Sequence, residues 1–169
     1  MRIGVPLETQ ANETRVAATP ETVKKFIGQG HTVIVQSGAG INSSQPDSAY
    51  EAVGASIGSA SDALGADLVL KVRAPNATEL GQMQSNAVLL GMLDPFDNAN
   101  NAAMAAKGIT AFALEAAPRT TRAQSLDVLS SQANIAGYKA VMVAANEYQR
   151  FMPMLMTAAG TVKAARVLI

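Results

Sequence analysis

Short apolar runs alternate with amphipathic or alanine-rich stretches along the first two thirds of the chain. Runs such as NAVLLGML are almost continuously apolar, as is typical of a parallel strand buried on both faces. The apolar runs predict strands at residues 2–7, 31–38, 55–58, 66–72, 86–93 and 109–114. Between them, the patterns predict helices from Pro20 to Gly28 or Gly30 and over residues 47–53, 61–64, 78–84 and 97–107. This alternation predicts βαβ units and therefore an α/β fold with a mostly parallel sheet flanked by helices.

The last third of the chain shows a different pattern. A long helix is predicted from about Leu126 to Phe151, and Pro153 should stop it because the residue before a proline disfavours helical geometry. Residues 154–160 then predict a crossover segment, and ARVLI at residues 165–169 predicts one more strand. An apolar strand at the very end of a chain is unusual, since termini are normally exposed and polar. We therefore expect one Rossmann-like or flavodoxin-like domain over residues 1–151, with residues 152–169 leading into a second domain.

Composition narrows the range of functions. The chain has 13 acidic and 13 basic residues, so nothing in its charge suggests nucleic acid or an anionic membrane surface as a partner. It has no cysteine and a single histidine, His31, which argues against thiolate chemistry and against a metal site. No apolar run approaches the roughly 20 residues of a membrane-spanning helix. The start, MRIGVPLE, lacks the pattern of a signal peptide, so we expect a cytoplasmic protein.

The stretch PRTTRAQSLDVLSSQANIAGYKA, residues 118–140, concentrates polar groups at a predicted helix start. Thr121 and Gln124 fit the spacing of a capping box. Gln124, Asp127 and Ser130 or Ser131 recur every three or four residues, so one helix would hold them on one side. Together with Arg119 they could hold a polar, ring-shaped ligand. The alternative is a capped helix whose polar residues are merely solvated.

Several motifs of this chain resemble one protein family. PRTTRAQSLDVLSSQANIAGY, MRIGVPLETQANETRVAATPETV, LVLKVRAP and MTAAGTVKAARVLI resemble the NAD(H)-binding component, the N-terminal domain of the alpha subunit, of the proton-translocating NAD(P) transhydrogenases. The alanine dehydrogenases share the N-terminal part of this pattern. The shared positions are Pro6, Glu8, Glu13, Arg15, Thr19 and Pro20.

The resemblance to the transhydrogenases implies a function. Arg119, Gln124, Asp127 and Ser130 match a loop that binds NAD(H), and the first three are the catalytic candidates because they would orient the nicotinamide ring. Hydride would pass from NADH to NADP⁺ on a partner component, coupled to proton translocation by a membrane component. The family further implies a homodimer at the membrane periphery. A nucleotide-binding domain would follow residue 151, and the isolated 169-residue chain would be inactive without it.

The resemblance to the alanine dehydrogenases implies a different pocket. Arg15 and Lys71 match the arginine and lysine that bind the substrate carboxylate and carbonyl in that family. The histidine that those enzymes need after the following strand is missing here, where Asp94 stands nearby. Arg15 and Lys71 could instead only pair with Glu8 or Glu13. A third possibility is a non-catalytic assembly module that packs on partners through its alanine-rich long helix.

Overall fold

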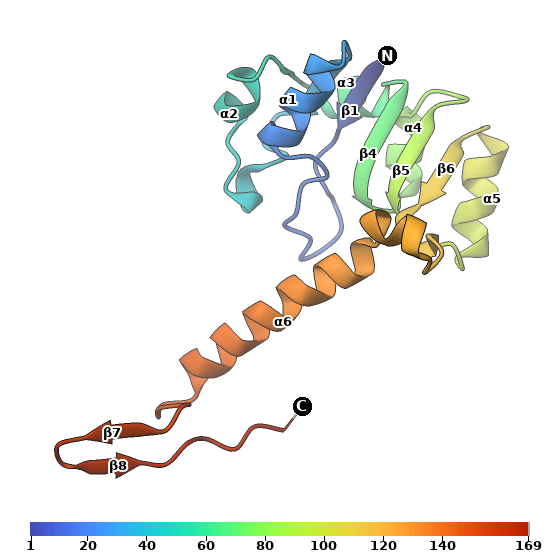
Figure 1. Cartoon of the computed structure of the whole chain (residues 1–169). Coiled ribbons are helices and arrows are strands. Elements are labelled where there is room, and N and C mark those ends of the chain that lie inside the picture. Colours follow the sequence, from blue (N-terminus) through green and yellow to red (C-terminus); the bar gives the residue numbers. More distant parts are fainter. Residues whose placement is uncertain (169) are drawn as a thin grey trace. The chain divides into compact units, whose positions relative to one another are not determined.

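The computed structural model describes residues 1–168. The chain forms two compact units, Met1–Leu126 and Asp127–Ile169. The first unit is an α/β domain, and the second consists of a long helix followed by a small hairpin (Figure 1).

The first unit contains a six-stranded sheet in which all neighbouring strands are parallel. Its strands are β1 (Arg2–Val5), β2 (Thr32–Gln36), β3 (Ser56–Gly58), β4 (Leu68–Arg73), β5 (Val88–Met92) and β6 (Thr110–Ala113). The helices between them are α1 (Pro20–Gly28), α2 (Asp47–Glu51), α3 (Ala60–Leu64), α4 (Ala77–Gln82) and α5 (Asn98–Ala106). Three 3₁₀ turns complete the unit, namely η1 (Ile41–Ser43), η2 (Leu114–Ala116) and η3 (Thr121–Leu126). The predicted α/β class and the predicted strands of this unit are confirmed.

The strand order is β3-β2-β1-β4-β5-β6, so the direction of winding reverses between β1 and β4. In open α/β sheets of this kind, ligands bind at the carboxyl ends of the two strands where the order reverses. The loops that follow β1 and β4 are therefore the first place to look for a site.

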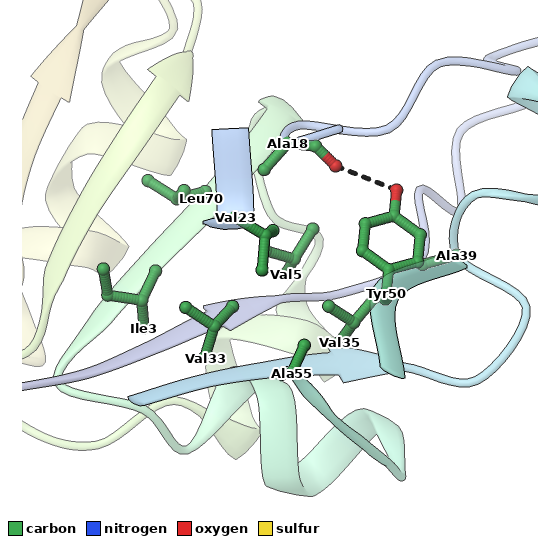
Figure 2. Close-up of a cluster of buried hydrophobic side chains, with 10 residues drawn as sticks. All are labelled: Ile3, Val5, Ala18, Val23, Val33, Val35, Ala39, Tyr50, Ala55 and Leu70. Atoms are coloured by element: carbon green, nitrogen blue, oxygen red, sulfur yellow. Dashed lines mark hydrogen bonds between the residues drawn. The ribbon is translucent and has the colours of Figure 1, made fainter. Parts of the chain in front are cut away.

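Two clusters of buried side chains hold the helices on the sheet. One cluster joins Ile3 and Val5 of β1 to Val33 of β2 and Val23 of α1 (Figure 2). The other contains Val69 of β4 and further residues of the opposite half of the sheet. Alternate residues of one strand enter different clusters, as the pleat of a strand buried on both faces requires.

Tyr50 is the largest fully buried side chain of the domain, and its hydroxyl donates a 2.9 Å hydrogen bond to the carbonyl oxygen of Ala18. Burial raises the pKa of the Tyr50 hydroxyl. We expect Tyr50→Phe to lower the free energy of unfolding by about 1–2 kcal/mol, because the buried Ala18 carbonyl loses its partner. Urea unfolding measures this. Tyr138→Phe is the control, since Tyr138 is 69% exposed and its variant should match the wild type.

The sequence signals for helix starts hold in this unit. The Thr19 hydroxyl accepts a hydrogen bond from the Thr22 backbone N–H, and Pro20 takes the first helical position of α1, as predicted. Capping boxes open α3 and α4, with Ser59 and Asp62 in one and Asn76 and Glu79 in the other. The box at α4 also places a carboxylate beside the candidate site.

The second unit differs from the prediction in two ways. Its helix, α6 (Val128–Glu147), ends four residues before Phe151. No residue of α6 is buried, so no tertiary packing holds a further turn. The predicted crossover is instead an antiparallel hairpin of β7 (Leu155–Thr157) and β8 (Gly160–Val162).

The prediction of a strand over residues 165–169 is also wrong for the described residues. Residues 163–168 belong to no strand, and Ile169 lies outside the described part of the chain. The β-forming residues just before this segment pair locally instead. Gly160 turns the hairpin with a φ of 128°, and the Thr157 hydroxyl donates to the Gly160 carbonyl at 3.0 Å. That the segment after residue 151 leads into another domain stays a prediction.

Candidate functional site

A cavity of about 550 Å³ opens where the sheet order reverses. It is lined by Glu8, Thr9, Gln10, Lys71, Ala74, Pro75, Asn76, Ala77, Glu79, Asp97 and Asn100. These residues come from the loop after β1, the end of β4, the start of α4 and the start of α5. The cavity thus lies where the fold predicts a ligand site.

Lys71 is the basic residue that lines this cavity, and it is held between two carboxylates. Its Nζ lies 2.9 Å from Oε1 of Glu79 and 3.4 Å from Oε2 of Glu8. The side chains of Lys71 and Glu8 are each 1% exposed, and that of Glu79 is 8% exposed. Burying three charges is tolerable only because each has partners at hydrogen-bond distance.

Glu8 also closes a gap in the sheet. The pairing of β4 with β5 shifts register between Leu70 and Arg73, and Glu8 accepts hydrogen bonds from backbone N–H groups next to this irregularity. Its Oε1 accepts from Val72 at 2.6 Å, and its Oε2 accepts from Arg73 at 3.2 Å. Burial raises the pKa of Glu8, while Lys71 and the two N–H groups act in the opposite direction. The loop after β1 is therefore tied to the end of β4.

Glu79 contributes to this site, and the sequence reasoning missed it. As the third residue of α4 it accepts from the Asn76 backbone N–H at 2.9 Å, while its backbone N–H donates to the Asn76 side chain at 2.9 Å. Its other oxygen, Oε1, accepts from Lys71 and from the Thr9 hydroxyl. The spacing Asn-x-x-Glu just after the strand was the available signal, because it predicts a capping box. The same carboxylate caps a helix and neutralises Lys71.

Arg15, the other predicted pocket residue, is bound to Glu13. Two guanidinium nitrogens of Arg15 donate to the two carboxylate oxygens of Glu13, at 2.7 and 2.6 Å. Arg73 donates to the same carboxylate at 2.9 Å. Arg15 is not among the residues that line the cavity, whereas Lys71 is. The pairing with Glu13 and Glu8 that the sequence left open as an alternative is present in the structure.

Glu13 should make the stability of the chain depend on acid pH. Its two arginine partners, Arg15 first, lower the pKa of Glu13 to about 2. Because this folded-state pKa lies below the unfolded value, the stabilisation is fully present above about pH 5 and is lost as the pH falls toward 2. We expect Glu13→Gln to cost about 1–2 kcal/mol at pH 7 and progressively less below pH 5, since its partners are partly exposed.

Urea unfolding of Glu13→Gln and of the wild type between pH 3 and 7 measures this difference. Glu51→Gln is the matched control, because Glu51 is an exposed helical glutamate. A Glu13→Gln deficit that stays constant down to pH 3 would contradict the prediction.

The four predicted loop residues do not lie on one helix. Gln124 belongs to η3, Asp127 precedes α6 as its N-cap, and Ser130 lies in the first turn of α6. The predicted helix start at Thr121 is wrong. Asp127 caps α6 instead, because its short carboxylate reaches the Ser130 backbone N–H at 2.9 Å.

The loop residues are nonetheless accessible. Arg119, Gln124 and Ser130 are exposed, and Asp127 is half-buried. Arg119 and Gln124 belong to the first compact unit, and Asp127 and Ser130 to the second.

Other sites fall away. Within the part of the chain that the structure describes, no group of three or more His, Cys, Asp or Glu residues could hold a metal. His31 directly precedes β2 and therefore lies at the amino edge of the sheet, away from the cavity. Asp94 follows β5, where its backbone N–H donates to Glu115 at 2.7 Å. Among the described residues, no helix is both long enough and apolar enough to span a bilayer.

The fold and the cavity define a doubly wound α/β domain with a polar site at its switch point. Comparison with known proteins identifies the family. Residues 4–136 match the family described as alanine dehydrogenase/PNT, N-terminal domain, and the chain belongs to this family.

Curated relatives and solved structures agree with this assignment. The chain is 48% identical over 177 residues to the first of the alpha-subunit chains of the NAD(P) transhydrogenase of Rhodospirillum rubrum, covering 100% of this chain and 46% of that protein. It is 44% identical to NAD(P) transhydrogenase subunit alpha of Haemophilus influenzae, covering 100% of this chain and 33% of that protein.

Among solved structures, a transhydrogenase from Sinorhizobium meliloti is similar with a TM-score of 0.93 and 52% identity, over 98% of this chain and 50% of that one. An L-alanine dehydrogenase is similar with a TM-score of 0.79 and 33% identity, over 86% of this chain and 40% of that one. The chain thus spans half or less of the length of these relatives.

Proposed function

We propose that this chain is the first α/β domain of the NAD(H)-binding component of a proton-translocating NAD(P) transhydrogenase. The observation that carries the proposal is the match of the entire chain to transhydrogenase alpha subunits at 44–48% identity. In this role the domain takes part in hydride transfer from NADH to NADP⁺, and a partner component holds the NADP⁺. The test is hydride transfer by the NAD(H)-binding component that contains this chain, combined with an NADP-binding component. No transfer with NADH as donor would refute the proposal.

The proposed contact with the nicotinamide end of NAD(H) is the segment from Arg119 to Ser130. The chemistry of its side chains fits that group. The Gln124 amide can bond a carboxamide, and Asp127 and Ser130 can bond ribose hydroxyls. Arg119 can adjust to redox state, because oxidised nicotinamide is cationic and reduced nicotinamide is neutral. The cofactor supplies the hydride chemistry, and these accessible residues bind and orient it.

The cavity at Lys71 raises the question of an alanine dehydrogenase. We expect the NAD(H)-binding component to show no NAD⁺ reduction that depends on L-alanine. No histidine stands beside Lys71 to accept a proton, since His31 lies at the opposite edge of the sheet. A spectrophotometric assay at 340 nm with an alanine dehydrogenase as positive control measures this. NADH formation that responds to added L-alanine would favour the dehydrogenase function.

Helix α6 supports the proposal of a homodimer. Ile135, Tyr138, Val141 and Met142 are 51–69% exposed, so the helix presents apolar surface with no cover in its own unit. Association of two copies would bury it. Sedimentation equilibrium giving a monomer mass at all concentrations would argue against a dimer. Partner components would place the complex at the cytoplasmic side of a membrane.

A further inference from the structure

The hydrogen bonds at the start of α6 fix the polarity of one group in the proposed cofactor site. Ser130 has two donors, its backbone N–H and its hydroxyl, and both point to Asp127. The N–H donates to Oδ1 at 2.9 Å, and the hydroxyl donates to Oδ2 at 2.6 Å. A carboxylate only accepts, so the direction of both bonds is settled by chemistry.

We infer that Ser130 contacts the cofactor as a hydrogen-bond acceptor, and that the group it binds is a hydroxyl of the nicotinamide ribose. The inference rests on the proposed function. The hydroxyl proton of Ser130 is committed to Asp127, which leaves the lone pairs of Oγ for a ligand. A ribose hydroxyl can donate to those lone pairs, whereas a phosphate, carboxylate or carbonyl oxygen cannot.

Asp127 is then a positioning residue for Ser130. Its negative charge sits directly behind the serine oxygen, strengthens that oxygen as an acceptor and disfavours anionic groups at the same place. Asp127→Asn separates this role from helix capping. Asparagine caps a helix as well as aspartate does, because its side-chain oxygen still accepts from the Ser130 N–H. Its amide nitrogen, however, faces the serine oxygen as a donor and turns the hydroxyl proton outward.

The experiment measures binding of NADH and of two analogues, in which fluorine replaces either the 2′- or the 3′-hydroxyl of the nicotinamide ribose. Fluorine cannot donate a hydrogen bond. In the wild-type NAD(H)-binding component, one analogue should bind about 5- to 10-fold more weakly than NADH. Ser130→Ala should remove this difference, and Asp127→Asn should reduce it. Ser131→Ala is the matched control that keeps it, because the Ser131 hydroxyl donates to the Asp127 backbone carbonyl at 3.0 Å instead.

A second measurement, on the 169-residue chain, reports the cap alone. Amide exchange at Ser130 should accelerate in Asp127→Ala and stay near the wild-type rate in Asp127→Asn. The two hypotheses fail separately. If wild-type component does not bind NADH, the proposed function fails. If NADH binds but neither analogue is weaker, or Ser130→Ala keeps the difference, the polarity inference is wrong.

Discussion

Replacing Lys71 with alanine should destabilise the folded chain by about 3–5 kcal/mol at pH 7, as expected when one partner of a buried ion pair is removed. Lys71 is the cation between Glu8 and Glu79, at 3.4 and 2.9 Å. Without it, two carboxylates remain buried close to each other with no cation between them. Urea unfolding measures the loss as a fall in the denaturation midpoint.

The control is a surface ion pair of the same chemistry. Lys25 lies 3.4 Å from Glu21, one helical turn away, and both side chains are at least 70% exposed. Lys25→Ala should cost less than about 0.5 kcal/mol, because solvent already screens the pair. The penalty for Lys71→Ala should also shrink at acid pH, since burial raises the pKa of Glu8 and protonation removes its charge. A Lys71→Ala variant as stable as Lys25→Ala would show that water or protons relieve the cluster at no cost.

The sequence predicted the sheet well because burial leaves a direct record in the residues. Strands covered on both faces need apolar side chains at every position, so runs such as NAVLLGML stand out without any knowledge of tertiary structure. Thr19 and Pro20 likewise mark the start of α1, because capping is local chemistry. The predicted placement of Lys71 at the carboxyl edge followed from its strand alone.

The errors arose where the outcome depends on competition between neighbouring signals. Thr121 and Asp127 are both possible N-caps, and the backbone forms a 3₁₀ turn before Asp127 caps α6. Residues 155–162 could cross over to a distant strand or pair with each other, and the local hairpin is what forms. Periodicity does not distinguish these alternatives.

The partners of Lys71 were harder to predict because they depend on tertiary structure. Glu8 and Lys71 meet only because β1 and β4 are adjacent in the sheet, a consequence of strand order. Glu79 was missed although Asn76 precedes it with capping-box spacing. Recognition of that box would have placed the start of α4 beside the end of β4, and with it a carboxylate beside Lys71.

The second large effect is expected on hydride transfer. In the NAD(H)-binding component that contains this chain, Gln124→Ala should slow hydride transfer by roughly 10- to 100-fold, the equivalent of about 1–3 kcal/mol for a hydrogen bond that orients a reacting group. The free energy of unfolding should change little, because Gln124 is exposed. Single-turnover kinetics with NADH measures the step, and Gln149→Ala, at another exposed glutamine, is the matched control.

Asp127 needs a comparison of two variants, because it caps α6 as well as lying in the proposed site. Asp127→Ala should lose about 0.5–2 kcal/mol of stability with the cap, whereas Asp127→Asn should keep it. Both should slow hydride transfer if the charge acts on the cofactor or on Ser130. If Asp127→Asn and Gln124→Ala both turn over at the wild-type rate, the segment is only a capped helix start with solvated polar residues, and the nicotinamide must be oriented by other residues.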